Sequence, residues 1–330
     1  MDLDAFAAVH RPQWERLRLL SRRRRLSGEQ ADELLRLYQG ASAHLSLIRS
    51  VAPEGPLSAS LSNTLARART RFTGAPSNAM EDLGVFFAVA LPLAFYRLRW
   101  LTLAIGAATA LVALLVGAWV SGNPAVLHAL AGDAALRTLV DHDFVGYYSA
   151  NPAASFTGQV WTNNAWVAAQ CVAFGITGVW VPYVLLQNAL NLGLVGGVMV
   201  AYGRGDVFFS YIAPHGMLEL TAVFVAAAAG LRIFWSWISP APRPRLSALA
   251  REGRSLVTVA LGLVPVLFVS GLVEGFVTPS SLPVPAKLGI GALALAAFWA
   301  YALIPGRRAA AAGLSADLPD RDAGDTVISA

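Results

Sequence analysis

The chain has 330 residues, of which 56% are hydrophobic and 14% are charged, and its formal net charge is +5. This composition and a mean hydropathy of +0.54 exclude an ordinary soluble domain and favour a polytopic membrane protein. The single cysteine, Cys171, excludes an intramolecular disulfide framework and a multi-cysteine zinc site.

Residues 1–76 are predicted to form a small cytoplasmic domain of three amphipathic helices. Apolar residues recur there at spacings of three and four, which is typical of helices with one buried face. Ser27 and Gln30 have the spacing of a capping box and predict the start of the second helix. No apolar segment near the start resembles a cleavable signal peptide.

The rest of the chain is predicted to be an all-α membrane helix bundle with about six spans. Residues 77–100 are expected to form an interfacial or re-entrant segment, because their apolar run is only about 13 residues long and contains Pro92. Residues 101–306 then contain apolar runs long enough to cross a bilayer, while residues 307–330 resemble a disordered cytoplasmic tail. The expected spans are about 101–120, 162–181, 183–202, 214–234, 255–273 and 288–304.

Basic residues predict the orientation of these spans. With six crossings, 22 of the 25 Lys and Arg residues fall on the side of the two termini. Because cytoplasmic segments carry such a surplus, we expect both termini in the cytoplasm of a multi-pass protein of the cell membrane. The surplus is a topology signal, so we expect no nucleic-acid partner.

Several polar residues interrupt the apolar runs near the predicted outer ends of the spans. Hydrocarbon offers such groups no partner, so they are expected to face one another, the backbone or a wet cavity. Two interpretations stay open: a functional intramembrane cluster, or helix-end residues, with Glu219 favoured by the helix dipole. The candidate cluster is Asn163, Asn164, His215, Glu219 and Glu274.

A metal site or an active site is not expected here. His215 and Glu219 at positions i and i+4 offer two ligands, whereas a closed zinc site needs four. No nucleophile lies at a recognisable spacing from a base. We therefore expect no metal, no cofactor and no enzymatic activity.

A third group of residues predicts close helix packing. Small residues let two helices approach closely while amides hydrogen-bond across the contact. We expect a helix–helix contact, including the possibility of a homodimer, at Asn188, Asn191, Gly193, Gly196 and Gly197.

Two motifs together resemble the stage II sporulation protein M family. They are Pro214-His215-Gly216-Met217-Leu218-Glu219-Leu220, continued through Gly230-Leu231-Arg232, and Val273-Glu274-Gly275-Phe276-Val277-Thr278-Pro279. The N-terminal helices, with Arg11, Trp14, Leu17 and the run Glu33–Tyr38, are similar to the soluble lead-in of the actinobacterial type. The likeness extends from about residue 5 to about residue 306 and departs from the family at Asn191-Leu192-Gly193.

The resemblance implies an integral membrane protein with no assigned catalysis. In spore formers the family member is similar to a scaffold for a peptidoglycan-degrading complex. We therefore expect a scaffold or assembly protein that organises a cell-envelope complex through membrane and cytoplasmic protein partners. The alternative is a transporter or lipid-handling permease that uses the outer polar cluster as its site.

Overall fold

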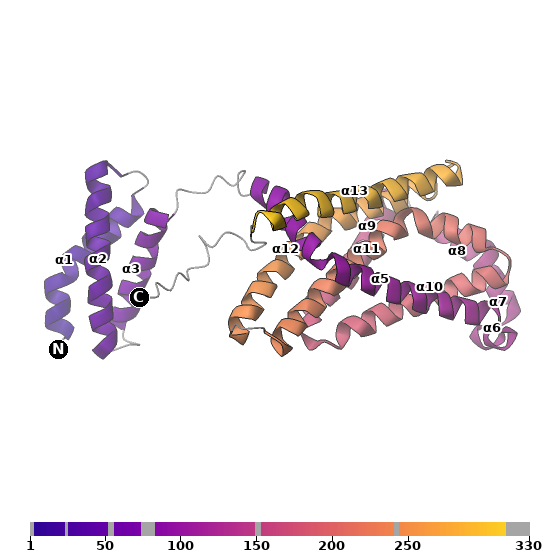
Figure 1. Cartoon of the computed structure of the whole chain (residues 1–330), viewed down its shortest axis with the longest axis horizontal. Coiled ribbons are helices and arrows are strands. Elements are labelled where there is room, and N and C mark those ends of the chain that lie inside the picture. Colours follow the sequence, from indigo (N-terminus) through magenta and orange to yellow (C-terminus); the bar gives the residue numbers. More distant parts are fainter. Residues whose placement is uncertain are drawn as a thin grey trace. The chain divides into compact units, whose positions relative to one another are not determined.

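The secondary structure of the computed structural model consists of helices in the residues that it describes, and these residues fall into two compact units. The first unit extends to Leu83 and the second begins at Gly84 (Figure 1). The described residues are 3–23, 26–51, 56–73, 83–148, 153–240 and 244–314. Most of the tail expected over 307–330 lies outside them.

The N-terminal unit is a bundle of three helices, α1 (Leu3–Arg22), α2 (Gly28–Val51) and α3 (Pro56–Thr73). Its core consists of large side chains that recur at helical spacing, and the largest of them are completely buried. The predicted capping box is confirmed, because the Gln30 amide donates to Ser27 Oγ and the Ser27 amide donates to Gln30 Oε1, both at 3.3 Å. The core includes Leu17, Leu20, Leu34, Ile48, Leu61 and Ala68.

Aromatic and imidazole rings pack together between α1 and α2. The ring centroids of His10 and His44 are 4.0 Å apart, and Phe6 lies 4.5 Å from His10. Trp14 Nε1 donates to His44 Nδ1 at 3.2 Å. Burial lowers the pKa of His44, and the neighbouring His10 lowers it further.

The second unit confirms the predicted all-α membrane bundle. Five of its helical segments are long and apolar enough to cross a membrane. Three of them are single helices: α10 (Trp180–Ala201), α11 (Gly205–Ile238) and α13 (Val284–Ala311). The segment Leu83–Ser121 includes a π-helical turn at Phe86–Ala90 and then α5 (Leu91–Ser121). The segment Arg245–Val277 joins α12 (Arg245–Leu272) to the π-helical turn η4 (Val273–Val277).

A sixth long helix, α9 (Ala153–Ala173), packs against α11 and α12. It has the length of a span but is not among the five, because Gln and Asn side chains lower its hydropathy. It ends at Ala173, before the end that we expected at residue 181. A short 3₁₀ turn, Gly175–Thr177, and Gly178 at a positive φ of 71° then reverse the chain into α10.

The structure also differs from the sequence-based expectation at the start of the first span, whereas α5 ends at Ser121, close to the expected residue 120. Residues 83–100 continue into α5 without a break, and the π-helical turn Phe86–Ala90 lies directly before Pro92. The part of the expected interfacial segment before residue 83 lies outside the described residues. After α5 the chain forms short helices: α6 (Pro124–Leu130), α7 (Asp133–Thr138), a π turn at Leu139–Asp143 and α8 (Phe144–Tyr147).

Close approach of backbones holds this bundle together. A Cβ built at Gly230 in α11 would overlap the Cys171 carbonyl oxygen in α9, and one at Gly291 in α13 would overlap the Pro214 carbonyl oxygen in α11. Small residues at such contacts are typical of helix packing in membranes, where large side chains gain little by leaving lipid.

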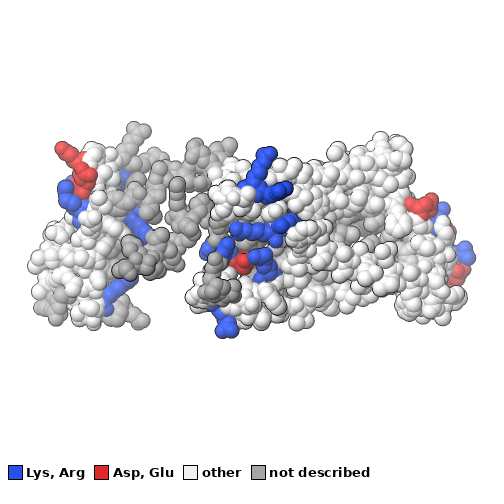
Figure 2. Space-filling view, viewed as in Figure 1, with Lys and Arg blue, Asp and Glu red and all other residues white. Residues whose placement is uncertain are grey.

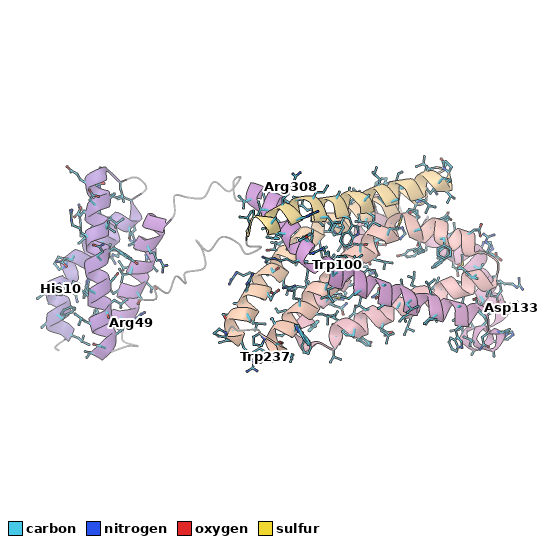
Figure 3. All side chains as sticks on the ribbon, viewed as in Figure 1. His10, Arg49, Trp100, Asp133, Trp237 and Arg308 are labelled. Carbon is cyan, nitrogen blue, oxygen red and sulfur yellow. The ribbon has the colours of Figure 1, made fainter. Side chains whose placement is uncertain are left out.

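Charged residues of the second unit gather at its two ends. Figure 2 shows most Lys and Arg at one end, and an uncharged band between that end and the other. Trp237 and Arg308 lie at the arginine-rich end, whereas Asp133 lies at the opposite end (Figure 3). The uncharged band matches what a bilayer requires of a protein surface.

Candidate functional site

The centre of the candidate site is a buried group of one histidine and two glutamates. His215 and Glu219 lie one turn apart on α11, and Glu274 lies in the π-helical turn η4 after α12. One possible metal-ligand atom from each residue lies within 4.8 Å of the other two. The structure therefore brings together residues that are more than fifty positions apart in the sequence.

The π turn directs Glu274 toward α11. The Thr278 amide donates to the Val273 carbonyl oxygen at 3.0 Å, which is the wide i to i+5 bond of a π turn. Single π turns inside α-helices occur frequently at functional sites. Glu274 is 4% exposed, and its Oε1 lies 3.8 Å from His215 Nε2.

Hydrogen bonds hold the His215 ring and backbone from two directions. Its Nδ1 lies 3.3 Å from Thr278 Oγ1, and its carbonyl oxygen accepts from Ser270 Oγ at 3.1 Å. Residues from α12 and from the end of η4 thus fix the position of α11.

A buried lysine extends this network to α13. Lys287 is 8% exposed, and its Nζ donates to the Thr278 carbonyl oxygen at 2.6 Å. The ammonium also lies 5.7 Å from the centre of the Tyr211 ring. Gly291, one turn further along α13, permits this approach because it packs directly on the Pro214 backbone beside His215.

Aromatic residues cover the group on the side of the short helices. The Tyr148 ring lies 6.2 Å from the His215 ring and 5.1 Å from the Tyr211 ring. Burial raises the pKa of Tyr148, and the negative charge of Glu274 raises it further. Tyr148 is therefore a neutral hydroxyl close to the two acids at ordinary pH.

The two asparagines of the predicted cluster lie elsewhere on α9. Asn163 is exposed and lines a shallow surface depression together with other α9 residues, including Trp166. Asn164 is half-buried. The group that the structure brings together consists of His215, Glu219 and Glu274, without the asparagine pair.

The glycines of the predicted helix–helix contact pack within the chain. A Cβ at Gly193 would approach the Ala113 carbonyl oxygen of α5 to 2.5 Å, and one at Gly197 would approach the Gly117 carbonyl oxygen to 2.8 Å. Gly196 faces the Phe208 ring of α11. The two asparagines take no part in this contact: Asn188 donates to Val184 of its own helix, and Asn191 is exposed.

Four residues of the network were not among the predicted site residues: Tyr148, Ser270, Thr278 and Lys287. Lys287 is the only lysine in the sequence, and its position near the start of an apolar helix was the one signal that could have identified it. Ser270 and Thr278 are small hydroxyl residues of a common type, so only their contacts reveal them.

A second polar feature lies at the arginine-rich end, where α5, α11 and α12 enclose a cavity of about 940 Å³. Arg232 Nε pairs there with Glu252 Oε2 at 2.8 Å. The cavity lining includes four arginines, at positions 97, 99, 232 and 251.

Two family models match the chain. The model described as Stage II sporulation protein M matches residues 103–279, just over half of the chain and all three residues of the buried group. A model described as a domain of unknown function (DUF8413) matches residues 4–74, the three-helix unit. No curated protein and no solved structure matches this chain.

Proposed function

The chain belongs to the Stage II sporulation protein M family, and we propose that this multi-pass membrane protein is a scaffold. Its bundle would hold membrane partners of a cell-envelope complex, and its three-helix domain would recruit cytoplasmic ones. The proposal assigns it no catalysis of its own.

One observation carries this proposal: the buried polar groups contact one another across helices. Through Ser270, Thr278 and Lys287 the network joins α11, α12 and α13. Hydrogen bonds of this kind fix helices relative to one another, because breaking them would leave polar groups unpaired in hydrocarbon. Such a fixed bundle suits a platform for assembly better than an alternating transport pathway.

The division into two units supports the proposal further. The three-helix unit has a hydrophobic core of its own, separate from the core of the bundle. It also leaves several large apolar side chains exposed, among them Val9 and Leu19 on α1 and Leu47 on α2. Exposed apolar residues on a small soluble domain are available for contact with another protein.

We also propose that both termini are cytoplasmic. The arginine-rich end of the bundle carries exposed Trp100, Trp235 and Trp237, which are typical of a membrane interface. A test would introduce single cysteines at exposed positions of a Cys171→Ala background: Ser60→Cys, Arg245→Cys and His128→Cys. An impermeant thiol reagent applied to intact cells should label only the last of these. Labelling of the first two would contradict the orientation.

Affinity purification of the full chain in mild detergent tests the scaffold role. We expect stoichiometric envelope proteins to co-purify, and the mass of the complex also tests the expected homodimer. The chain eluting alone from native membranes would contradict the proposal. In proteoliposomes, a solute or lipid flux that Glu219→Gln abolishes in a folded protein would favour the permease instead.

A further inference from the structure

The buried group has the geometry of an incomplete ion site. His215 Nε2 and Glu274 Oε1 are 3.8 Å apart, which is too long for a hydrogen bond. Two ligands of one zinc ion, each at about 2.0–2.2 Å from it, are separated by roughly 3.4 Å in a tetrahedral arrangement. A shift of a few tenths of an ångström would therefore place a metal ion between these two atoms.

The proton positions in the network strengthen this argument. Thr278 Oγ1 lies 3.4 Å from the Val273 carbonyl oxygen and 3.3 Å from His215 Nδ1. When its one proton goes to the Val273 carbonyl oxygen, it accepts from His215 Nδ1, so that Nδ1 carries the ring proton and Nε2 presents a lone pair to the Glu274 carboxylate. Two electron-rich atoms face each other at this point, and only a cation or an added proton between them makes the arrangement favourable.

Glu274 also has an oxygen that the protein leaves unused. Its Oε2 is buried and has no hydrogen-bond partner among the described residues. A buried carboxylate oxygen without a partner is costly, most of all in a membrane protein. If Glu274 binds an ion through both oxygens, His215 Nε2 and one Glu219 oxygen complete four ligand atoms.

The ammonium group of Lys287 does not occupy the place between the His215 and Glu274 side chains. Lys287 directs its ammonium at the Thr278 carbonyl oxygen and lies against the Tyr211 ring. Its single charge also balances only one of the two carboxylates. The group therefore needs a further positive charge for both acids to be ionised.

From these observations we propose that His215, Glu219 and Glu274 bind one divalent transition-metal cation of the zinc class. An imidazole nitrogen with carboxylate oxygens is a donor set that such ions accept. Thr278 is an outer partner that fixes the ring orientation of the histidine ligand, as is usual for metal-bound histidines. The ion would connect α11 to η4 and stabilise the bundle on which the proposed scaffold role depends.

The sequence placed Glu274 in the candidate cluster but counted only His215 and Glu219 as possible ligands, so it did not predict a metal site. The third ligand comes from a different helical segment, and its second oxygen supplies the fourth donor atom. Four protein donor atoms would complete the tetrahedral coordination of one such ion.

Cobalt binding tests the proposal, because Co²⁺ replaces Zn²⁺ and its visible absorption reports a low-coordinate nitrogen and oxygen site. The full chain would be purified in detergent without a histidine tag, stripped with a chelator and titrated with Co²⁺. We expect saturation at about one ion per chain, and displacement of the spectrum by Zn²⁺.

Isosteric variants locate the site. Glu274→Gln and Glu219→Gln each remove a ligand charge and should lower Co²⁺ affinity by more than about 100-fold, whereas Thr278→Val should lower it by about 10–100-fold, as for outer partners. Glu252→Gln is the matched control, because Glu252 pairs with Arg232 on α11 outside this group. It should bind Co²⁺ as the unmodified chain does.

A measurement on the unmodified chain keeps the test decisive if the variants fail to fold. A bound ion stabilises the folded state by mass action, so added Zn²⁺ should raise the melting temperature of the stripped protein. If folded protein shows neither the Co²⁺ spectrum nor this shift, the proposal is wrong, and protons neutralise the two acids instead. Metal binding can fail in this test while partners still co-purify, so the two proposals are tested separately.

Discussion

The two units of the molecule use opposite kinds of residues to pack their helices. In the three-helix unit, fully buried leucine and isoleucine side chains fill the space between α1, α2 and α3. In the membrane unit, glycines at positions such as 230 and 291 bring backbones into direct contact. The difference follows from the solvent: water drives large apolar side chains inward, whereas lipid does not, so close packing decides the contacts in the bundle.

This comparison predicts its largest effect for a small-to-large substitution in the membrane unit. Gly291→Leu places a side chain where the Pro214 backbone lies, and a backbone cannot move aside as a side chain can. We expect a loss of stability at or above the upper end of the about 1–3 kcal/mol usual for overpacking. Thermal unfolding in detergent, followed by size-exclusion chromatography, measures it.

The control for this prediction lies on the same helix. A Cβ at Gly289 would meet no atom within 4 Å, so Gly289→Leu should leave the melting temperature nearly unchanged. Equal destabilisation by the two variants would show that helix propensity or membrane insertion, and not the contact with Pro214, limits stability.

A large-to-small substitution should have the larger effect in the N-terminal unit. Leu17 is fully buried on α1, so Leu17→Ala should destabilise this unit by about 2–5 kcal/mol, through lost burial and the cavity that remains. Leu19 on the same helix is 58% exposed, and Leu19→Ala should change stability by less than about 0.5 kcal/mol. Amide hydrogen exchange of α1–α3 in the full chain measures both.

The two units also differ in how far the sequence predicted them. The periodicity of leucines such as Leu17 and Leu34 predicts α1–α3, because a soluble helix must bury one face. Periodicity gives no such help in the membrane unit, because all faces of a membrane helix can be apolar. Run length alone placed the helix bounds there, and the structure has different bounds at residues 83–100 and at the end of α9.

The candidate site was predictable only in part, for a related reason. His215 and Glu219 stand out because charged or titratable residues are rare in apolar helices. Glu274 meets them from a π turn, and no local sequence pattern records that turn. Asn163 was predicted to join this cluster but is exposed on α9. A polar residue in an apolar helix does not by itself reveal which face of the helix it occupies.

Acidification should lower the stability of the three-helix unit, and we expect this effect to be smaller than those of the core substitutions. The pKa of His44 is lowered by burial and by His10, so the unfolded chain takes up a proton at a higher pH than the folded domain does. Stability is therefore complete above the unfolded pKa of about 6.5 and falls as the pH drops below it.

Hydrogen exchange of α1 and α2 in the full chain, corrected for the intrinsic effect of pH, should show protection decreasing between about pH 7.5 and 5.5. His44→Gln keeps a polar side chain opposite Trp14 but cannot take up the proton, and it should remove the pH dependence in this range. If the dependence persists in His44→Gln, another group causes it.

The smallest expected effect concerns the ion pair between α1 and α2. Arg16 donates to Glu33 through Nε at 2.9 Å and through Nη2 at 2.8 Å, and this pairing lowers the pKa of Glu33. Both side chains are partly exposed, so water and salt screen the attraction. Glu33→Gln should slightly lower the protection of the three-helix unit from amide hydrogen exchange at low salt, and the difference should vanish at high salt.

Glu15→Gln, which removes an exposed acid from α1, is the control for the change in net charge. A Glu33→Gln effect that is large and insensitive to salt would show that this unit depends on a specific polar contact, as the membrane unit does, and would remove the contrast between them.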